Sequence, residues 1–224
     1  TPLFEPLSEF DGADIRFSRE LHMSENLQAE GDLQLYGGQL EDRFTTIELD
    51  GETLLGMNTS VTFEHLKLRY ALMALELDIT SPAFAPLIDG FNALTAVDPA
   101  FADLAADWSQ DDGWFYYHGL GLQYSLDRLL VTTEWYAVNG PDEGFSTDAT
   151  GWYLSVQHTW GRMTPYAVIG EYRSLTNPAI VDSINASFAV LPAGVLPAAD
   201  ALRQAALFAA ESFNVKERTL TLGL

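Results

Sequence analysis

Apolar and polar residues alternate with a period of two along much of this chain. Residues 27–36 show the alternation most clearly, with apolar side chains or glycine at the odd positions and polar ones at every even position except the last. Successive side chains of a β-strand point to opposite faces of a sheet, so this pattern predicts a strand with one apolar and one polar face. Nine such segments occur, at 13–21, 27–36, 55–63, 66–79, 114–124, 129–138, 152–160, 166–173 and 216–224.

The alternation changes phase inside one of these segments, 66–79. The apolar residues from Leu66 to Leu72 share one parity, whereas those from Leu75 to Ile79 share the other. An extra residue on one strand of a pair shifts all later side chains to the opposite face. We therefore expect a β-bulge at this change of phase.

Short and long connections alternate between the segments. The short ones, at 22–26, 64–65, 125–128 and 161–164, predict tight hairpins. The others are longer than a hairpin loop, with about 16 residues after Tyr36, about 34 after Ile79, about 13 after Val138 and about 42 after Arg173. Short turns at one end of a meander and long loops at the other are typical of outer-membrane β-barrels, whereas a soluble sandwich mixes loop lengths at both ends.

Two of the long connections have helical character. One contains Asp98 followed by Pro99, a pair that favours a helix start, and predicts a helix over 98–107. The other is rich in alanine and predicts a helix over 198–213. Two arrangements are open for these helices: each packs over the base of its loop, or one of them folds into the lumen and narrows it.

The strand pattern predicts an all-β protein, an antiparallel up-and-down transmembrane β-barrel formed by one domain over residues 1–224. Composition narrows the choice of function. With 11 Lys and Arg against 32 Asp and Glu, the formal net charge is −21, which argues against binding to nucleic-acid phosphates. The absence of cysteine excludes disulfides and thiolate metal sites. A hydrophobic content of 47% is too high for a disordered acidic chain, and no apolar stretch approaches the roughly 20 residues of a transmembrane helix.

The two faces of the predicted sheet suit two different solvents. The outer face of a membrane barrel is apolar, with aromatic girdles at both interfaces. We expect the girdles to be formed by Trp114, Tyr116, Tyr124, Trp135, Trp152, Trp160, Tyr166 and Tyr172. Val168 is assigned to the same face as Tyr166 and Tyr172. We expect the lumen to be lined by the charged residues Asp14, Arg16, Glu30, Asp32, Lys67, Arg69, Glu134, Glu171 and Arg173.

Three stretches, 113–140, 151–174 and 217–224, carry a resemblance to a known family. In their residue pattern and in the local sequence of their hairpins they resemble the porin superfamily of Gram-negative outer membranes. The resemblance implies a location in the cell outer membrane, contact with its lipid and lipopolysaccharide, a trimer, and a water-filled channel for passive diffusion of small hydrophilic solutes and ions. Single-chain bacterial barrels have an even number of strands and water-filled porins have 16–18. We therefore expect the chain to be part of a 16-stranded barrel, incomplete at its C-terminus and at its N-terminus.

The sequence offers little evidence of catalysis. The four histidines are scattered, and none of the common metalloprotease, hydrolase or nucleotide-binding motifs occurs. We expect no enzymatic activity, no metal and no cofactor. Because acidic residues greatly outnumber basic ones, we expect the channel to prefer cations. Two alternatives stay open at this stage: a soluble ligand-binding β-barrel, and an outer-membrane barrel that serves as an anchor, adhesin or enzyme.

Overall fold

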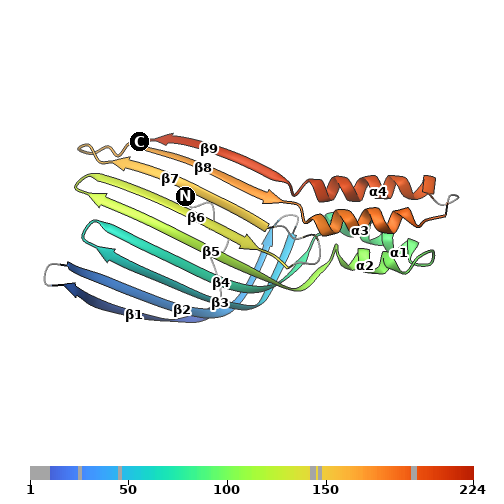
Figure 1. Ribbon diagram of the computed structural model, residues 1–224, viewed down its shortest axis with the longest axis horizontal. Coiled ribbons are helices and arrows are strands. Elements are labelled where there is room, and N and C mark those ends of the chain that lie inside the picture. The colour runs from blue at the N-terminus through green and yellow to red at the C-terminus, as the bar shows by residue number, and fades with distance from the viewer. Residues whose placement is uncertain (1–10, 25–26, 45–46, 142–144, 146–147, 193–195) are drawn as a thin grey trace.

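The computed structural model describes residues 11–24, 27–44, 47–141, 145, 148–192 and 196–224 of the chain. In this part of the chain nine strands form one sheet, and five helical segments lie in two of the connections (Figure 1). The strands are β1 (Asp11–Ser24), β2 (Leu27–Phe44), β3 (Ile47–Phe63), β4 (Leu66–Thr80), β5 (Gln110–Leu126), β6 (Leu129–Asn139), β7 (Asp148–His158), β8 (Tyr166–Leu175) and β9 (Val215–Gly223). The helical segments are η1 (Pro82–Phe84), α1 (Ala85–Leu94), α2 (Ala100–Ala106), α3 (Pro178–Ala189) and α4 (Leu196–Glu211).

The nine predicted strands and their up-and-down order are confirmed. Each strand pairs antiparallel with its neighbours in sequence, and the sheet order is β1 to β9. The sheet is curved but not closed, so β1 and β9 are its two edges (Figure 1). Because neighbouring strands run in opposite directions and their number is odd, both edge strands run the same way. They run from the end that carries the helices, here called the helical end, toward the opposite end, here called the turn end.

The connection between β2 and β3 is much shorter than predicted. Both strands continue beyond the expected ends, and their pairing reaches Phe44 opposite Ile47, with one register shift between Gly38 and Leu40. Only residues 45 and 46 separate the two strands, where the sequence pattern predicted a loop of about 16 residues. Continued pairing satisfies the backbone N–H and C=O groups of this segment within the hairpin. The predicted strict alternation of short and long connections is wrong at this point.

The phase change in β4 is not a bulge. The pairing of β4 is continuous with β3 from Leu66 to Glu76 and with β5 from Leu66 to Leu77. The apolar side chains change face instead, because Leu75 and Leu77 lie with Leu54 in a buried cluster. The partly buried residues packed against that cluster are Tyr36, Met73, Ile79 and Phe115. Toward the helical end, therefore, the face that is polar elsewhere becomes apolar.

Two connections fold together into a helical cluster beyond the strand ends (Figure 1). Helices α1 and α2 follow β4, and α3 and α4 precede β9; α1 packs against α2 and α4, and α3 packs against α2 and α4. The predicted helices are confirmed as α2 and α4, whereas α1 and α3 were not predicted. Helix α3 starts with Pro178 after Asn177, whose side chain accepts a hydrogen bond from the backbone N–H of Ala179 at 3.0 Å.

The largest hydrophobic core lies inside this helical cluster. Phe91 and Phe101 of the first connection meet Ile184 and Phe188 of the second, and the rings of Phe101 and Phe188 lie edge to face at 5.1 Å. The helices of the two connections therefore bury one another, which neither of the two arrangements expected from the sequence describes. Among the described residues, no helix combines the length and apolar character needed to span a membrane.

Truncation of a buried phenylalanine tests this packing. Phe101→Ala is expected to destabilise the helical cluster by about 3–5 kcal/mol, because the side chain is 0% exposed and its loss leaves a cavity. Phe208→Ala in α4 makes the same truncation at a side chain that is 76% exposed, and its effect is expected to stay within about 0.5 kcal/mol. Denaturant unfolding followed by far-UV circular dichroism measures both variants. Equal losses would contradict the packing.

Candidate functional site

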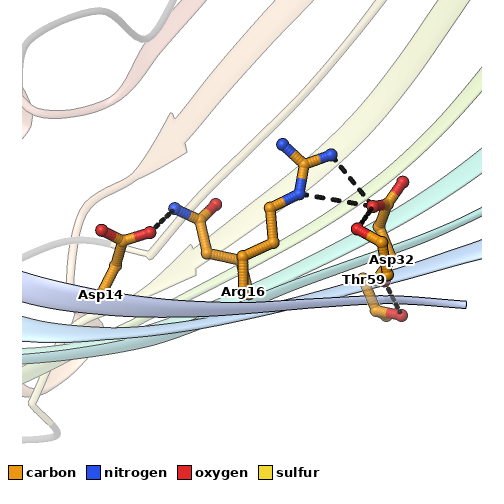
Figure 2. Close-up of polar contacts among 6 residues, drawn as sticks. Asp14, Arg16, Asp32 and Thr59 are labelled. Atoms are coloured by element: carbon orange, nitrogen blue, oxygen red, sulfur yellow. Dashed lines mark hydrogen bonds and ion pairs between the residues drawn. The ribbon is translucent and has the colours of Figure 1, made fainter.

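The faces of the sheet can be followed across all nine strands, because directly paired residues of antiparallel strands have their side chains on the same face. One cross-strand row consists of Arg16, Gln34, Asn58, Ala71, Gly119, Tyr136, Gly151, Tyr172 and Glu217. The sheet curls toward the side from which Arg16 projects (Figure 2). We call this side the concave face and the opposite side the convex face.

Most of the predicted site residues lie on the expected faces. The predicted lumenal residues found on the concave face are Asp14, Arg16, Glu30, Asp32, Lys67, Arg69 and Glu134. The predicted girdle residues found on the convex face are Trp114, Tyr116, Tyr124, Trp135 and Trp152. Trp160 lies outside the strands, in the β7–β8 turn, where it is exposed. The roles of these residues in a pore or a girdle stay predictions.

The face assignment of β8 is wrong by one residue. Glu171 pairs directly with Trp152 and therefore lies on the convex face, together with Arg173 two positions later. The pairing of β8 with β7 puts the other parity, Tyr166, Val168 and Tyr172, on the concave face. Residues 166–169 are all apolar or aromatic, so alternation does not define the phase of this strand. The register with β7 defines it instead.

A first polar cluster joins β1 and β2 on the concave face (Figure 2). Arg16 donates from Nη2 and Nε to Oδ1 of Asp32, at 3.0 and 3.3 Å, and the Ser18 hydroxyl donates to the same oxygen at 2.6 Å. Toward the helical end, Gln34 donates from Nε2 to Oδ2 of Asp14 at 2.8 Å. These bonds fix the position of the Asp32 carboxylate and leave the Arg16 guanidinium largely exposed.

A second polar cluster is centred on Glu134 of β6. Arg69 of β4 donates to its Oε2 at 2.6 Å, Tyr117 of β5 donates to its Oε1 at 3.1 Å, and Tyr153 of β7 donates to its Oε2 at 3.2 Å. The Glu134 side chain is only 12% exposed, whereas the Arg69 side chain is 51% exposed. Charge-assisted bonds of this kind are stronger than neutral ones and hold both partners in one geometry. The cluster therefore presents a fixed guanidinium to solvent over a nearly covered carboxylate.

Tyrosine rings cover glycines of neighbouring strands on the same face. A Cβ on Gly151 would lie 2.2 Å from Oη of Tyr136, and one on Gly56 would lie 2.1 Å from Cζ of Tyr36. Tyr136 is almost fully buried, and its ring stacks on that of Tyr117 at 6.2 Å and 18°. Tyr117, Tyr136 and Tyr153 were not among the site residues predicted from the sequence. The signal that could have found them is a glycine of polar parity opposite an aromatic residue in the next strand.

The charges on the concave face sum to a negative value. Among the strand residues whose side chains the structure describes and whose cross-strand pairing is regular, its carboxylates are Asp14, Glu20, Glu30, Asp32, Glu134 and Glu217, and its cations are Arg16, Lys67 and Arg69, so the sum is 3 − 6 = −3. Charges of both signs along such a surface attract counter-ions and orient the dipoles of passing solutes. No group of three or more histidine or acidic side chains suited to a metal ion occurs among the described residues.

No family model, no curated protein and no solved structure matches this chain. The resemblance to porins therefore stays a prediction from the sequence pattern. The two faces of the sheet differ in the side chains that they carry, with the hydrogen-bonded clusters around Asp32 and Glu134 on the concave face.

A pair of glycine substitutions tests the tyrosine packing. Gly151→Ala is expected to destabilise the sheet by about 1–3 kcal/mol, because the new methyl group would displace the buried ring of Tyr136. Gly121→Ala is the matched control on the same face, since the nearest atom to its new Cβ is Nε of Arg69 at an ordinary 3.5 Å. Denaturant midpoints of the two variants measure the difference. A midpoint of Gly151→Ala at or above that of Gly121→Ala would contradict the packing of Tyr136 on Gly151.

Proposed function

We propose that this chain forms part of an outer-membrane β-barrel that acts as a water-filled channel for passive diffusion of small hydrophilic solutes and ions. The proposal is carried by one observation: among the described strand residues, most of the large exposed apolar side chains lie on the convex face, whereas the hydrogen-bonded clusters around Asp32 and Glu134 lie on the concave face. This distribution is the inverse of that in a soluble barrel, whose apolar side chains point inward.

The exposure of large apolar residues supports this orientation. On the convex face Phe17 is 54% exposed, Leu120 is 57% exposed and Trp135 is 47% exposed, and they come from strands at the edge and in the middle of the sheet. Soluble monomers rarely leave a continuous apolar surface of this extent in water. Hydrocarbon would cover these side chains without cost, since lipid tails are as apolar as they are.

Closure of the barrel is part of the proposal. An open sheet exposes unpaired N–H and C=O groups along β1 and β9, and hydrocarbon does not tolerate such groups. Since the two edges run in the same direction, an antiparallel closure needs an odd number of further strands. This number brings the total to an even one, as in single-chain bacterial barrels. We propose that segments outside residues 1–224 supply these strands and that the complete barrels assemble as trimers in the Gram-negative outer membrane.

Bilayer recording on the full-length protein tests the channel directly. Purification is expected to require detergent, and the protein is expected to produce stepwise conductance in planar lipid bilayers. A protein that stays monodisperse without detergent would support the soluble ligand-binding alternative and overturn the proposal. A protein that inserts into liposomes without conducting would support the alternative in which the barrel is an anchor, an adhesin or an enzyme.

Ion selectivity is expected to follow the charge of the concave face. Neutralising Glu30 and Asp32 together, by Glu30→Gln and Asp32→Asn, changes the sum of charges on the described concave face from −3 to −1. The reversal potential in a salt gradient is expected to move toward zero, by roughly half of its wild-type value, because the field that attracts cations weakens.

The control for this prediction is Glu76→Gln, because Glu76 pairs with Trp114 on the convex face. This substitution also removes one negative charge, but outside the proposed lumen. Its reversal potential is expected to equal that of the wild type. Equal shifts for the control and the double variant would show that total charge, rather than the concave face, sets the selectivity.

A further inference from the structure

Four charged residues of two neighbouring strands lie together on the convex face. Arg173 and Glu171 come from β8, and Lys216 and Arg218 come from β9. We call this group the β8–β9 patch. It holds three of the 11 basic residues in a chain of net charge −21, so its local charge of 3 − 1 = +2 is opposite in sign to that of the protein.

The basic groups of the patch have few hydrogen-bond acceptors around them in the described part of the chain. Arg218 donates from Nε to Oε2 of Glu171 at 2.7 Å, and Nε of Arg173 contacts Oε1 of the same carboxylate. Lys216 lies directly opposite Arg173 across the two strands, and like charges in direct opposition are unfavourable. In the described part of the chain, the terminal nitrogens of the two guanidiniums have no hydrogen-bond acceptor, and the side chains of Arg173 and Arg218 are 52% and 72% exposed.

The surroundings of the patch indicate the shape of its ligand. Glu171 pairs with Trp152, so the patch begins at the level of an exposed tryptophan, and Arg173 and Lys216 lie two residue pairs further toward the helical end. Toward the turn end the same two strands carry exposed apolar side chains, with Leu220 at 70% and Leu222 at 72% exposure. A ligand that fits both parts has an anionic head and apolar chains.

We propose that the β8–β9 patch binds the phosphate group of a membrane lipid whose acyl chains lie along the apolar part of β8 and β9. The inference rests on the orientation in the proposed function, in which the convex face contacts lipid. Guanidinium groups bind phosphate through paired N–H donors, and lysine adds a point charge. Glu171 positions the two guanidiniums through their Nε atoms, so that their outer edges stay available. A free anion would use the charges alone, and an acidic peptide would leave the leucines uncovered.

Lipid binding to the full-length protein in neutral detergent tests the proposal. The probe is diphosphorylated lipid A, titrated and followed by native mass spectrometry, with phosphatidylcholine as the neutral lipid and inorganic phosphate as a competitor. Lys216→Gln with Arg218→Gln is expected to weaken lipid A binding roughly tenfold or more, since each basic residue near a membrane surface contributes on the order of a factor of five. Arg218→Lys is expected to retain most of the affinity, because the charge is kept.

The matched control removes the same charges elsewhere. Lys67→Gln with Arg128→Gln changes the concave face and the β5–β6 turn at the turn end, and its lipid A affinity is expected to equal that of the wild type. Equal weakening by the two double variants, equal binding of phosphatidylcholine, or displacement of lipid A by millimolar inorganic phosphate would each overturn the lipid-phosphate proposal.

The test separates this inference from the channel proposal. Conductance of the Lys216→Gln and Arg218→Gln double variant is expected to match that of the wild type, since the patch lies outside the proposed lumen. A wild-type protein that binds lipid A at the patch but does not conduct would leave this inference standing and remove the channel. A protein that conducts, but whose affinity for lipid A is unchanged by the Lys216→Gln and Arg218→Gln substitutions, would leave the channel proposal standing and overturn this inference.

Discussion

Direct cross-strand pairing fixes the side of every residue in this sheet relative to all the others. A slip of one residue in any pair would turn a whole strand over, exchanging its apolar and polar side chains. The pairing of β1 to β9 keeps Arg16 of the first strand on the same face as Glu134 of the sixth and Glu217 of the last. The polar clusters and the tyrosine layer exist only because this relation is kept over nine strands.

The two faces are organised by different interactions. On the concave face, hydrogen bonds converge on a few covered carboxylates, so that Asp32 and Glu134 each hold a guanidinium that remains accessible. On the convex face, many large apolar side chains are exposed, and the β8–β9 patch brings three basic residues and one carboxylate together among them. The same face of a sheet rarely combines exposed leucines with paired arginines in water, whereas the boundary between hydrocarbon and head groups suits both.

The sequence predicted the strands well, because alternation is a local property of the chain. It failed wherever a neighbour in space decides the outcome. The phase of β8 is ambiguous in a run of apolar residues around Val168, and only the pairing with β7 defines it. The change of phase in β4 near Leu75 predicted a bulge. It arises instead because these apolar residues pack in a cluster with Leu54 of β3, a contact that the local sequence pattern does not show. Helix α3 and the long β2–β3 hairpin were missed for the same reason, since each depends on packing or pairing with a distant segment. The hydrogen bonds that Glu134 receives from three other strands could not be predicted from any single segment either.

The helical cluster has a mechanical consequence for the sheet. Its buried residues come from the connection after β4 and from the connection before β9, and Ile79 at the end of β4 packs against both this core and the apolar cluster of the sheet. The cluster thus connects the part of the curved sheet at β4 and β5 with the part at β8 and β9, and β6 and β7 lie between them. Flattening the arc at this end would pull Phe101 away from Phe188. The radius of curvature is therefore restrained at one rim of the sheet, while within the described residues the opposite rim has no such helical cluster.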